Sequence, residues 1–387
     1  MKKQIIMRTI LNLLISVPAM AQTNPVSSDV TTTSVKVEEV IPEFVKSAET
    51  AGDLRYRQQQ VKQDVNDIRN IQRLRFRLGQ TFKIQPDLKV TYRLMTGTSA
   101  TSGNVTLGDS KTPGAPRQSI GLDRAFAVYN PVDNWTLQIG KMLQVQNHPG
   151  NNQTFLESNV APEGYSINYK STVTSDIQMN LVGGSFWIRE KYDDAFGEDL
   201  TDSMLNLAQF ELQTKLSITK INLYYAVFSY TDLRYDKPAS FVAGATSAKG
   251  NTLDINGNYQ WQYEVQQLGA EFKFDFKPVE LSIYAEQLQN QSADDKNKAL
   301  IYGAGIKYKN WSLQWADKKI ESDSVFALYT ESDFADGQTN AKGQTLSVQY
   351  KFNKNAQISY AQSIAQQNYD ILPVDYKRST VDLVVSF

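Results

Sequence analysis

From residue 52 onward the chain repeats segments of about ten residues in which apolar side chains alternate with polar or small ones. In QRLRFRLGQTF, residues 72–82, one side carries Leu74, Phe76 and Leu78 while arginines fill the other. A period of two is that of a β-strand, because successive side chains point to opposite faces. The pattern therefore predicts strands with one apolar and one polar face.

The segments number about sixteen, and short connections between them alternate with long polar ones. The long connections are expected at 58–71, 98–118, 143–162, 189–203, 231–258, 289–298, 317–342 and 364–376. A soluble β-sandwich has no reason to place every long loop at one end. A transmembrane antiparallel β-barrel has short periplasmic turns, long extracellular loops and an even number of strands. We therefore expect an all-β fold of this kind.

The amino terminus has the features of an exported protein. Basic residues precede an apolar run at 10–17, which is followed by the small-residue site Ala19-Met20-Ala21. This pattern predicts a signal peptide at 1–21, with cleavage after Ala21. Residues 22–51 are expected to be a flexible periplasmic segment with a candidate short helix at 35–49, and 52–387 the barrel. No later segment has the ~18 apolar residues of a membrane helix.

Arginines occupy the polar face of the first three segments. They are Arg55, Arg57, Arg73, Arg75, Arg77 and Arg93. An arginine facing lipid at mid-depth costs about 2–4 kcal/mol, so the lumen of the barrel is the tolerable place for them. Such a wall sets ion preference in charged pores. Alternatively, these arginines pair with inward carboxylates and only stiffen the wall. Candidate partners are Asp123, Glu211, Glu271, Asp275, Glu286 and Asp382.

The segment at 120–129 departs from strict alternation. Ile120, Leu122, Phe126 and Val128 are expected on its outward apolar face, and Arg124 interrupts that set. In the segment at 221–230 both faces are apolar, so the pattern does not decide which face points outward.

Composition excludes several classes of function. Lys and Arg number 40 against 41 Asp and Glu, which is unlike the basic balance of a nucleic-acid-binding protein. The chain has no cysteine for a thiolate metal site. Its single histidine, His148, lies beside Pro149 without a recognisable nucleophile motif. We expect no enzyme activity, no metal and no cofactor; a barrel hydrolase is the least favoured alternative.

Several motifs in the first half resemble one known family. They are GDLRYR (52–57), RLRFRLG (73–79), TYRLMTG (91–97), GLDRAFAVYNP (121–131), LQIGKM (137–142) and APEGYSINY (161–169). Together they resemble the "putative porin" family of Gram-negative outer membranes. The resemblance implies a diffusion channel for small hydrophilic solutes and ions, surrounded by lipid and lipopolysaccharide and assembled as a homotrimer. The ending TVDLVVSF, with Phe387 last, resembles the signal read by the outer-membrane assembly machinery.

Connection 143–162 occupies the position of the constricting loop in general porins, and its Glu157 is a candidate acidic counterpart to the arginines. Connection 98–118 is equally eligible by length. The leading hypothesis is a passive porin in the cell outer membrane. The alternative is a surface adhesin or receptor that uses the barrel as an anchor.

Overall fold

The computed structural model describes residues 47–110, 113–114, 116–191, 201–242, 245 and 247–387. The strands are β1 (Glu49–Gln63), β2 (Arg69–Gln85), β3 (Leu88–Thr96), β4 (Val105–Thr106), β5 (Ile120–Tyr129), β6 (Trp135–Lys141), β7 (Glu163–Thr174), β8 (Ile177–Arg189), β9 (Ser203–Leu216), β10 (Thr219–Tyr230), β11 (Glu264–Asp275), β12 (Val279–Asn290), β13 (Lys298–Tyr308), β14 (Trp311–Ile320), β15 (Ala341–Lys351), β16 (Ala356–Gln367) and β17 (Val374–Ser386). The single-turn 3₁₀ helices are η2 (Pro149–Asn151), η3 (Pro238–Ser240), η4 (Ala327–Tyr329) and η5 (Ala335–Gly337).

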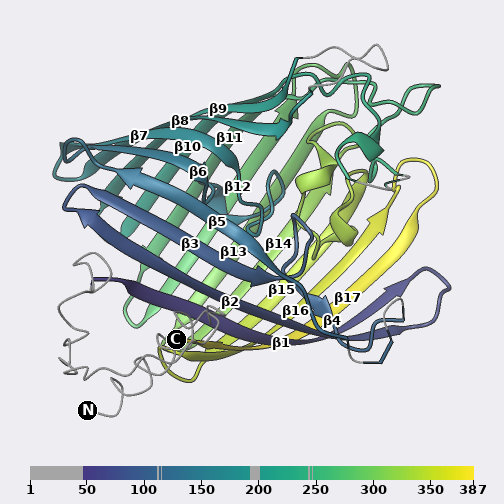
Figure 1. The fold of residues 1–387 in the computed structure, drawn as a ribbon, viewed down its shortest axis with the longest axis horizontal. Coiled ribbons are helices and arrows are strands. Elements are labelled where there is room, and N and C mark those ends of the chain that lie inside the picture. The colour runs from purple at the N-terminus through teal and green to yellow at the C-terminus, as the bar shows by residue number, and fades with distance from the viewer. Residues whose placement is uncertain (1–46, 111–112, 115, 192–200, 243–244, 246) are drawn as a thin grey trace, which may run out of the picture. The chain divides into compact units, whose positions relative to one another are not determined.

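The strands form one closed antiparallel barrel (Figure 1). Apart from β4, each strand pairs with the next along the chain, so that β3 pairs with β5, and β1 pairs with β17 to close the ring. The two-residue β4 pairs only with β2, so sixteen of the 17 described strands make up the wall. The sequence-based prediction of a barrel of sixteen strands is confirmed. Within the described residues, no helix is long and apolar enough to cross a membrane.

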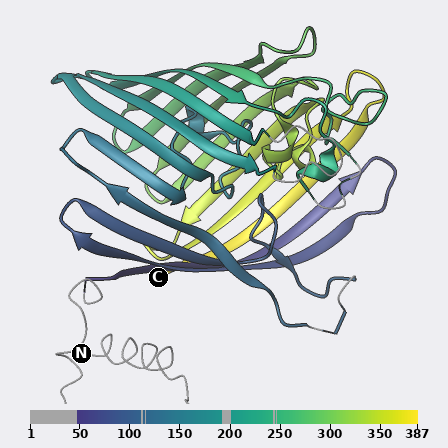
Figure 2. The same ribbon diagram turned by 45° about the horizontal axis from the view of Figure 1, so that its top comes forward.

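The connections alternate in length less strictly than expected. Connections 97–119, 142–162, 190–202, 231–263 and 321–340 are long, whereas 64–68, 291–297 and 368–373 are short. The difference is greatest between β1 and β2, where the polar residues of 58–63 and 69–72 continue the antiparallel ladder to Val61 opposite Arg69. Polar strand residues beyond the apolar segment therefore form a hairpin, not a loop. Figures 1 and 2 show the long connections gathered at one end of the barrel.

A β-bulge in β5 explains the irregular segment at 120–129. Arg93 of β3 lies opposite Arg124, but Leu94 lies opposite Leu122, so Asp123 is the extra residue. The bulge reverses the alternation: Ile120 and Leu122 are exposed on the outer face, whereas Phe126 is buried inside. The expectation that Phe126 and Val128 face outward is therefore wrong. Arg124 is not an exception, because after the bulge its parity is inward.

An apolar cluster occupies the interior beside β8–β13. It combines strand residues, such as Phe186 and Phe228, with residues of three long connections, such as Phe155, Tyr259 and Phe326. In β10, the strand with two apolar faces, Tyr224 is buried and Tyr225 is 47% exposed, which settles its orientation. The long connections thus fold back into the barrel and pack there.

Two expectations about the amino terminus fall outside the described residues. The signal peptide at 1–21 lies there entirely, as does the candidate helix at 35–49 except for its last three residues. Glu49 is the first residue of β1, so the barrel begins earlier than residue 52.

Candidate functional site in the barrel interior

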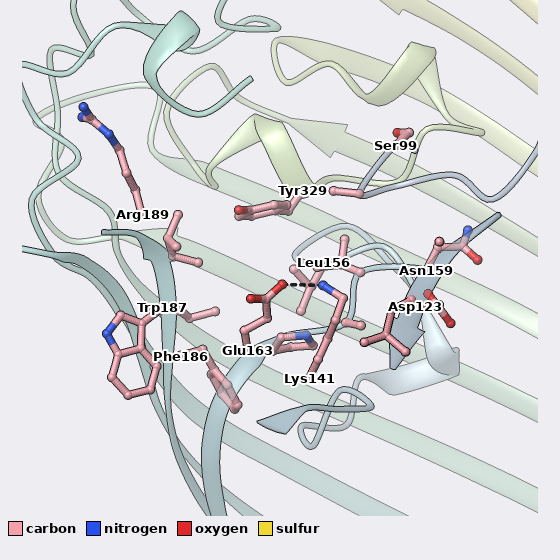
Figure 3. Close-up of a pocket in the computed structure, with 18 of the residues that line it drawn as sticks. Ser99, Asp123, Lys141, Leu156, Asn159, Glu163, Phe186, Trp187, Arg189 and Tyr329 are labelled. Carbon is pink, nitrogen blue, oxygen red and sulfur yellow. Dashed lines mark hydrogen bonds and ion pairs between the residues drawn. The ribbon is translucent and has the colours of Figure 1, made fainter. Parts of the chain in front are cut away.

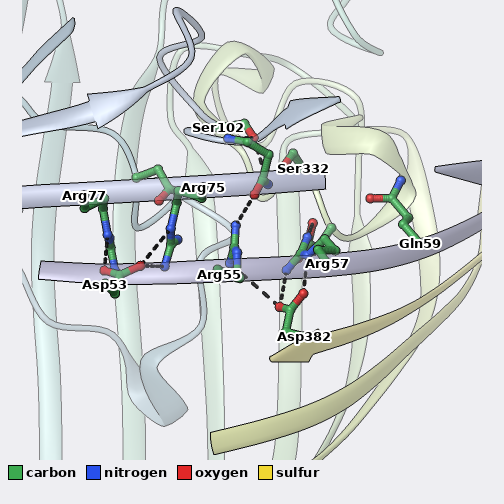
Figure 4. Close-up of polar contacts among 12 residues, drawn as sticks. Asp53, Arg55, Arg57, Gln59, Arg75, Arg77, Ser102, Ser332 and Asp382 are labelled. Carbon is green, nitrogen blue, oxygen red and sulfur yellow. Dashed lines mark hydrogen bonds and ion pairs between the residues drawn. The ribbon is translucent and has the colours of Figure 1, made fainter. Parts of the chain in front are cut away.

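The arginines of β1 and β2 share the face opposite the exposed apolar residues. Leu54 and Tyr56 are 44% and 42% exposed, whereas Arg57 and Arg75 are 5% and 7% exposed. In the register of the two strands, Arg55 lies opposite Arg75 and Arg57 lies opposite Arg73. Strand alternation thus brings arginines together in facing pairs, of which Figure 4 shows Arg55 and Arg75.

Two strand carboxylates neutralise part of this cluster. Asp53 accepts a hydrogen bond of 2.9 Å from Arg75 Nη2 and one of 2.5 Å from Arg77 Nε. Asp382, opposite Arg57 on β17, accepts two bonds of 2.7 Å from its Nε and Nη2. The Arg57–Asp382 pair is bidentate, the strongest arrangement of guanidinium and carboxylate. It also joins the two strands that close the barrel.

A third carboxylate reaches the arginines from connection 321–340. Asp333 lies 3.0 Å from Arg57 Nη1 and 2.6 Å from Arg378 Nη2, and Arg378 Nη1 donates to the carbonyl of Ser332 at 2.6 Å. Burial alone would raise the pKa of Asp333, but Arg378 and Arg57 lower its pKa to about 2. Asp333 is therefore ionised at neutral pH and fastens this connection to the β1–β17 wall.

Arg93 and Arg124 form a smaller group around Asp123. Arg93 Nε donates to Asp123 Oδ2 at 2.5 Å, and Arg124 Nε lies 3.8 Å from the same oxygen. The bulge in β5 places Asp123 and Arg124 side by side on the inner face. One carboxylate thus faces two guanidinium groups.

Connection 142–162 crosses the interior and binds the opposite wall. The backbone N–H of Asn147 donates to Gln209 of β9 at 2.7 Å. The Asn152 side chain donates to Glu286 of β12 at 2.6 Å, and His148 Nδ1 lies 2.8 Å from the same carboxyl group. Because His148 and Glu286 are both buried, this contact is an anchor for the connection. Gly150, at φ 61°, sits against the ring of Tyr284, where a Cβ atom would clash.

Glu157 joins connection 142–162 to connection 321–340. Its carboxylate accepts bonds from the Ser332 backbone N–H at 3.0 Å and the Ser332 hydroxyl at 3.2 Å. Its own backbone N–H donates to the carbonyl of Tyr329 at 2.7 Å. Burial and the nearby Asp333 raise the pKa of Glu157 to about 7. None of its hydrogen-bond partners among the described residues is an arginine.

A cavity of about 790 Å³ lies beside the end of β6 (Figure 3). Its lining includes outer-face residues and interior ones: Leu122, Trp187, Asp123, Phe186, Leu156 and Tyr329. Lys141, the last residue of β6, forms an ion pair of 2.5 Å with Glu163, the first residue of β7. The cavity is therefore a notch in the wall, where β6 and β7 end level with each other at Lys141 and Glu163 while β5 continues beyond them.

The structure collects the predicted arginines on one stretch of wall, β1 to β3, and places Glu157 in a contact between two connections, with Ser332. Sequence reasoning missed Asp53, Asp333 and Arg378. Alternation alone could have found Asp53 and Arg378, since both share the inward parity of their strands. Asp333 lies in a connection with no periodic pattern. Across the described residues, no group of three or more His, Cys, Asp and Glu is arranged to hold a metal ion.

Comparisons with known proteins fit this geometry. Residues 57–251 and 304–387, more than half of the chain, match a family model described as "Putative porin". A search of curated proteins found no match. Among solved structures, OprB of Pseudomonas putida at high pH is similar in fold, with 11% identity, a TM-score of 0.57, and 88% of this chain and 94% of that one covered. A triple mutant of the Rhodopseudomonas blastica porin has 9% identity and a TM-score of 0.46, with 88% of this chain and 100% of that one covered.

Proposed function

The chain belongs to the "Putative porin" family, and on that premise we propose that it forms a water-filled channel for passive diffusion of small hydrophilic solutes and ions. The observation that carries the proposal is the closed barrel with arginines on the inner face of β1 and β2. A barrel of about sixteen strands is wide enough to leave an aqueous channel. Lipid-facing arginine is costly, so an arginine face requires water or counter-charges inside.

Arg55, Arg57, Arg73, Arg75, Arg77 and Arg93 line this channel in our proposal. Carboxylates neutralise some of these arginines and not others. In our proposal the paired arginines stiffen the wall, and the remaining ones face the solute and set ion preference. Glu157 borders the channel through connection 142–162, which narrows it from the opposite wall. Around β1 and β2 the arginines outnumber the three carboxylates bound to them, Asp53, Asp333 and Asp382, and this local positive charge favours anions.

We place the channel in the cell outer membrane, after removal of the signal peptide near Ala21, with lipid and lipopolysaccharide around the apolar face. The carboxy-terminal Phe387 is the proposed contact for the outer-membrane assembly machinery. The Phe387 backbone exchanges hydrogen bonds of 2.9 and 3.0 Å with Gly52 of β1. This position agrees with a carboxy-terminal segment that pairs with β1 in the last step of barrel closure.

A homotrimer is the proposed assembly. The seven residues of β6 are fewer than the about 9–11 that a transmembrane strand requires. Pairing of β5 with β6 stops at Ala125 opposite Lys141, so the preceding residues of β5 have no partner strand on that side among the described residues. Unpaired backbone groups are not stable in lipid. A neighbouring subunit that covers this notch would remove them from lipid.

The adhesin and hydrolase alternatives gain no support from the interior. The long connections that an adhesin would present outward contribute Phe155, Tyr259 and Phe326 to the buried cluster. His148, the residue a hydrolase would use, is buried against Glu286 as an anchor. The family and fold point to a channel and not to an enzyme.

Planar lipid bilayers test the proposal. Purified, folded protein should give discrete conductance steps, and its reversal potential in a KCl gradient should favour chloride. Replacing both Arg73 and Arg75 by glutamate should shift that potential toward potassium. Silent bilayers with demonstrably folded protein would refute the channel, and an unchanged reversal potential would refute the role of these arginines.

A further inference from the structure

Four arginines form a compact block on the inner face of β1 and β2, which we call the arginine quartet: Arg55, Arg57, Arg73 and Arg75. Arg55 faces Arg75, and Arg57 faces Arg73, as direct cross-strand partners. Opposite side chains in an antiparallel pair have Cβ atoms about 4.5–5.5 Å apart, and diagonal ones about 7–8 Å. Like charges at these separations repel each other, so the quartet needs negative charge close by.

Within the described residues, carboxylates form hydrogen bonds with only one diagonal of the quartet. Arg57 is bound by Asp382 and Asp333, and Arg75 by Asp53. Arg55 instead donates to the neutral amide of Asn104 at 2.6 Å, and Asp382 is 3.8 Å from its Nη1. The Arg73 side chain has no hydrogen bond or ion pair in the described part of the chain. The other diagonal, Arg55 and Arg73, therefore carries two positive charges, and its only ion pair within the described residues is the long contact of Arg55 with Asp382, a carboxylate already bound by Arg57.

The unpaired donors on this diagonal are out of contact with bulk water. The Nε atoms of Arg55 and Arg73 are both buried and lack a hydrogen-bond partner. A buried donor without a partner is costly, more so when it belongs to a charged group. The Nε–H and one Nη–H of a guanidinium form a fork that matches two oxygens of an oxyanion. Arg55 and Arg73, which each carry such a group, are diagonal neighbours across one strand pair.

From this arrangement we propose that Arg55 and Arg73 form a binding site for a small doubly charged oxyanion of the phosphate or sulfate type. The proposal rests on the channel function and names the class of solute that it handles. A tetrahedral dianion supplies one negative charge and two acceptor oxygens to each guanidinium. A halide supplies one charge and no pair of oxygens.

The carboxylates around the quartet limit the site and its strength. Asp333 and Asp382 saturate Arg57, and Asp53 occupies Arg75, so the ligand is confined to the free diagonal. Asp333 itself is 40% exposed and adds negative charge at the border of the site. Binding of moderate strength suits a channel, because a solute that binds too tightly does not leave.

Phosphate block of the chloride current tests the site. Potassium phosphate is added to bilayers in KCl at constant ionic strength, and the half-blocking concentration is measured for wild type, Arg73→Gln, Arg73→Lys and Arg117→Gln. Since Arg73 has no bound carboxylate, its replacement leaves no carboxylate without its partner and should not impair folding. Arg117 is an exposed loop arginine and is the matched control for charge. Calorimetric titration of detergent-purified protein with phosphate measures binding without conduction.

We expect Arg73→Gln to raise the half-blocking concentration at least about tenfold, because it removes a charged hydrogen-bond donor. The half-blocking concentration of Arg73→Lys should fall between those of wild type and Arg73→Gln, since lysine keeps the charge but lacks the paired donors of a guanidinium group. An equal shift in Arg117→Gln, or none in Arg73→Gln, would overturn the site. A conducting wild type with no phosphate block and no calorimetric binding would overturn it too, while leaving the channel intact. Phosphate binding by a protein silent in bilayers would support the site and refute the channel.

Discussion

Replacing Glu157 with glutamine should remove a pH dependence from the docking of the two inward connections. Glu157 is 6% exposed, and its carboxyl group holds 142–162 against Ser332 of 321–340. Burial and Asp333 raise its pKa from the ordinary 4.5 to about 7. When docking raises the pKa of an acid, the docked state is most stable with that acid protonated. The docking free energy is therefore fully present below pH 4.5, declines as the pH rises toward 7, and stays low above it.

The size of the effect follows from the two pKa values. The interval from 4.5 to about 7, at about 1.4 kcal/mol per pH unit, corresponds to about 3 kcal/mol of docking free energy. That is about a hundredfold change in the population of undocked connections. Asp333, with its pKa at about 2, stays ionised over this range and contributes no change of its own.

Hydrogen exchange of peptides from 142–162 and 321–340 measures this docking. After correction for the intrinsic pH dependence of exchange, wild type should exchange up to about a hundredfold faster at pH 8 than at pH 4.5. Glu157→Gln keeps an acceptor for Ser332 but cannot ionise, so its corrected rates should be flat. The matched control Glu264→Gln changes an exposed carboxyl on β11 and should behave as wild type. A wild type without pH dependence, or a Glu157→Gln variant that retains it, would refute the reasoning.

Two further predictions concern the ion pairs. Arg57→Gln should destabilise the barrel by about 3–5 kcal/mol, because it leaves Asp382 and Asp333 without their shared cation. Urea unfolding in detergent measures this, and a loss as small as that of Arg117→Gln would contradict it. His148→Ala should loosen 142–162 from Glu286 and so raise both mean conductance and open-channel noise. Conductance identical to wild type would mean that Asn147 and Asn152 hold the connection alone.

The fold was predictable because alternation is a local signal repeated in every strand. Leu54 and Arg55 show their faces directly, whatever the rest of the chain does. The bulge at Asp123 was not predictable, since the extra residue itself is neither glycine nor proline, and one extra residue reverses every later side chain of the strand. Phe126 was therefore assigned to the wrong face.

The site was predictable only where it lies on strands. Arg57 and Asp382 both follow from inward parity, although they are 325 residues apart. Contacts between connections carry no such pattern: Glu157 meets Ser332 across 175 residues, and nothing in either segment indicates the other. Glu157 was the candidate acidic counterpart to the arginines. The connection residue that binds them is Asp333, through ion pairs with Arg57 and Arg378.

The pairing of Arg57 with Asp382 bears on how β1 and β17 find the correct register when they close the barrel. A slip of one residue between β1 and β17 would turn Leu54 and its neighbours inward, so the apolar pattern rejects odd misalignments. A slip of two residues keeps every side chain on its own face of the sheet, so the apolar pattern does not reject it. It would, however, set Arg57 opposite Thr380 or Val384, the present partners of Gln59 and Arg55. With Val384 opposite Arg57, Asp382 would face the neutral Gln59 and the ion pair would be lost, so the pair rejects that misalignment. With Thr380 opposite Arg57, Asp382 would face Arg55 instead, and Arg57 alone would lose its strand carboxylate.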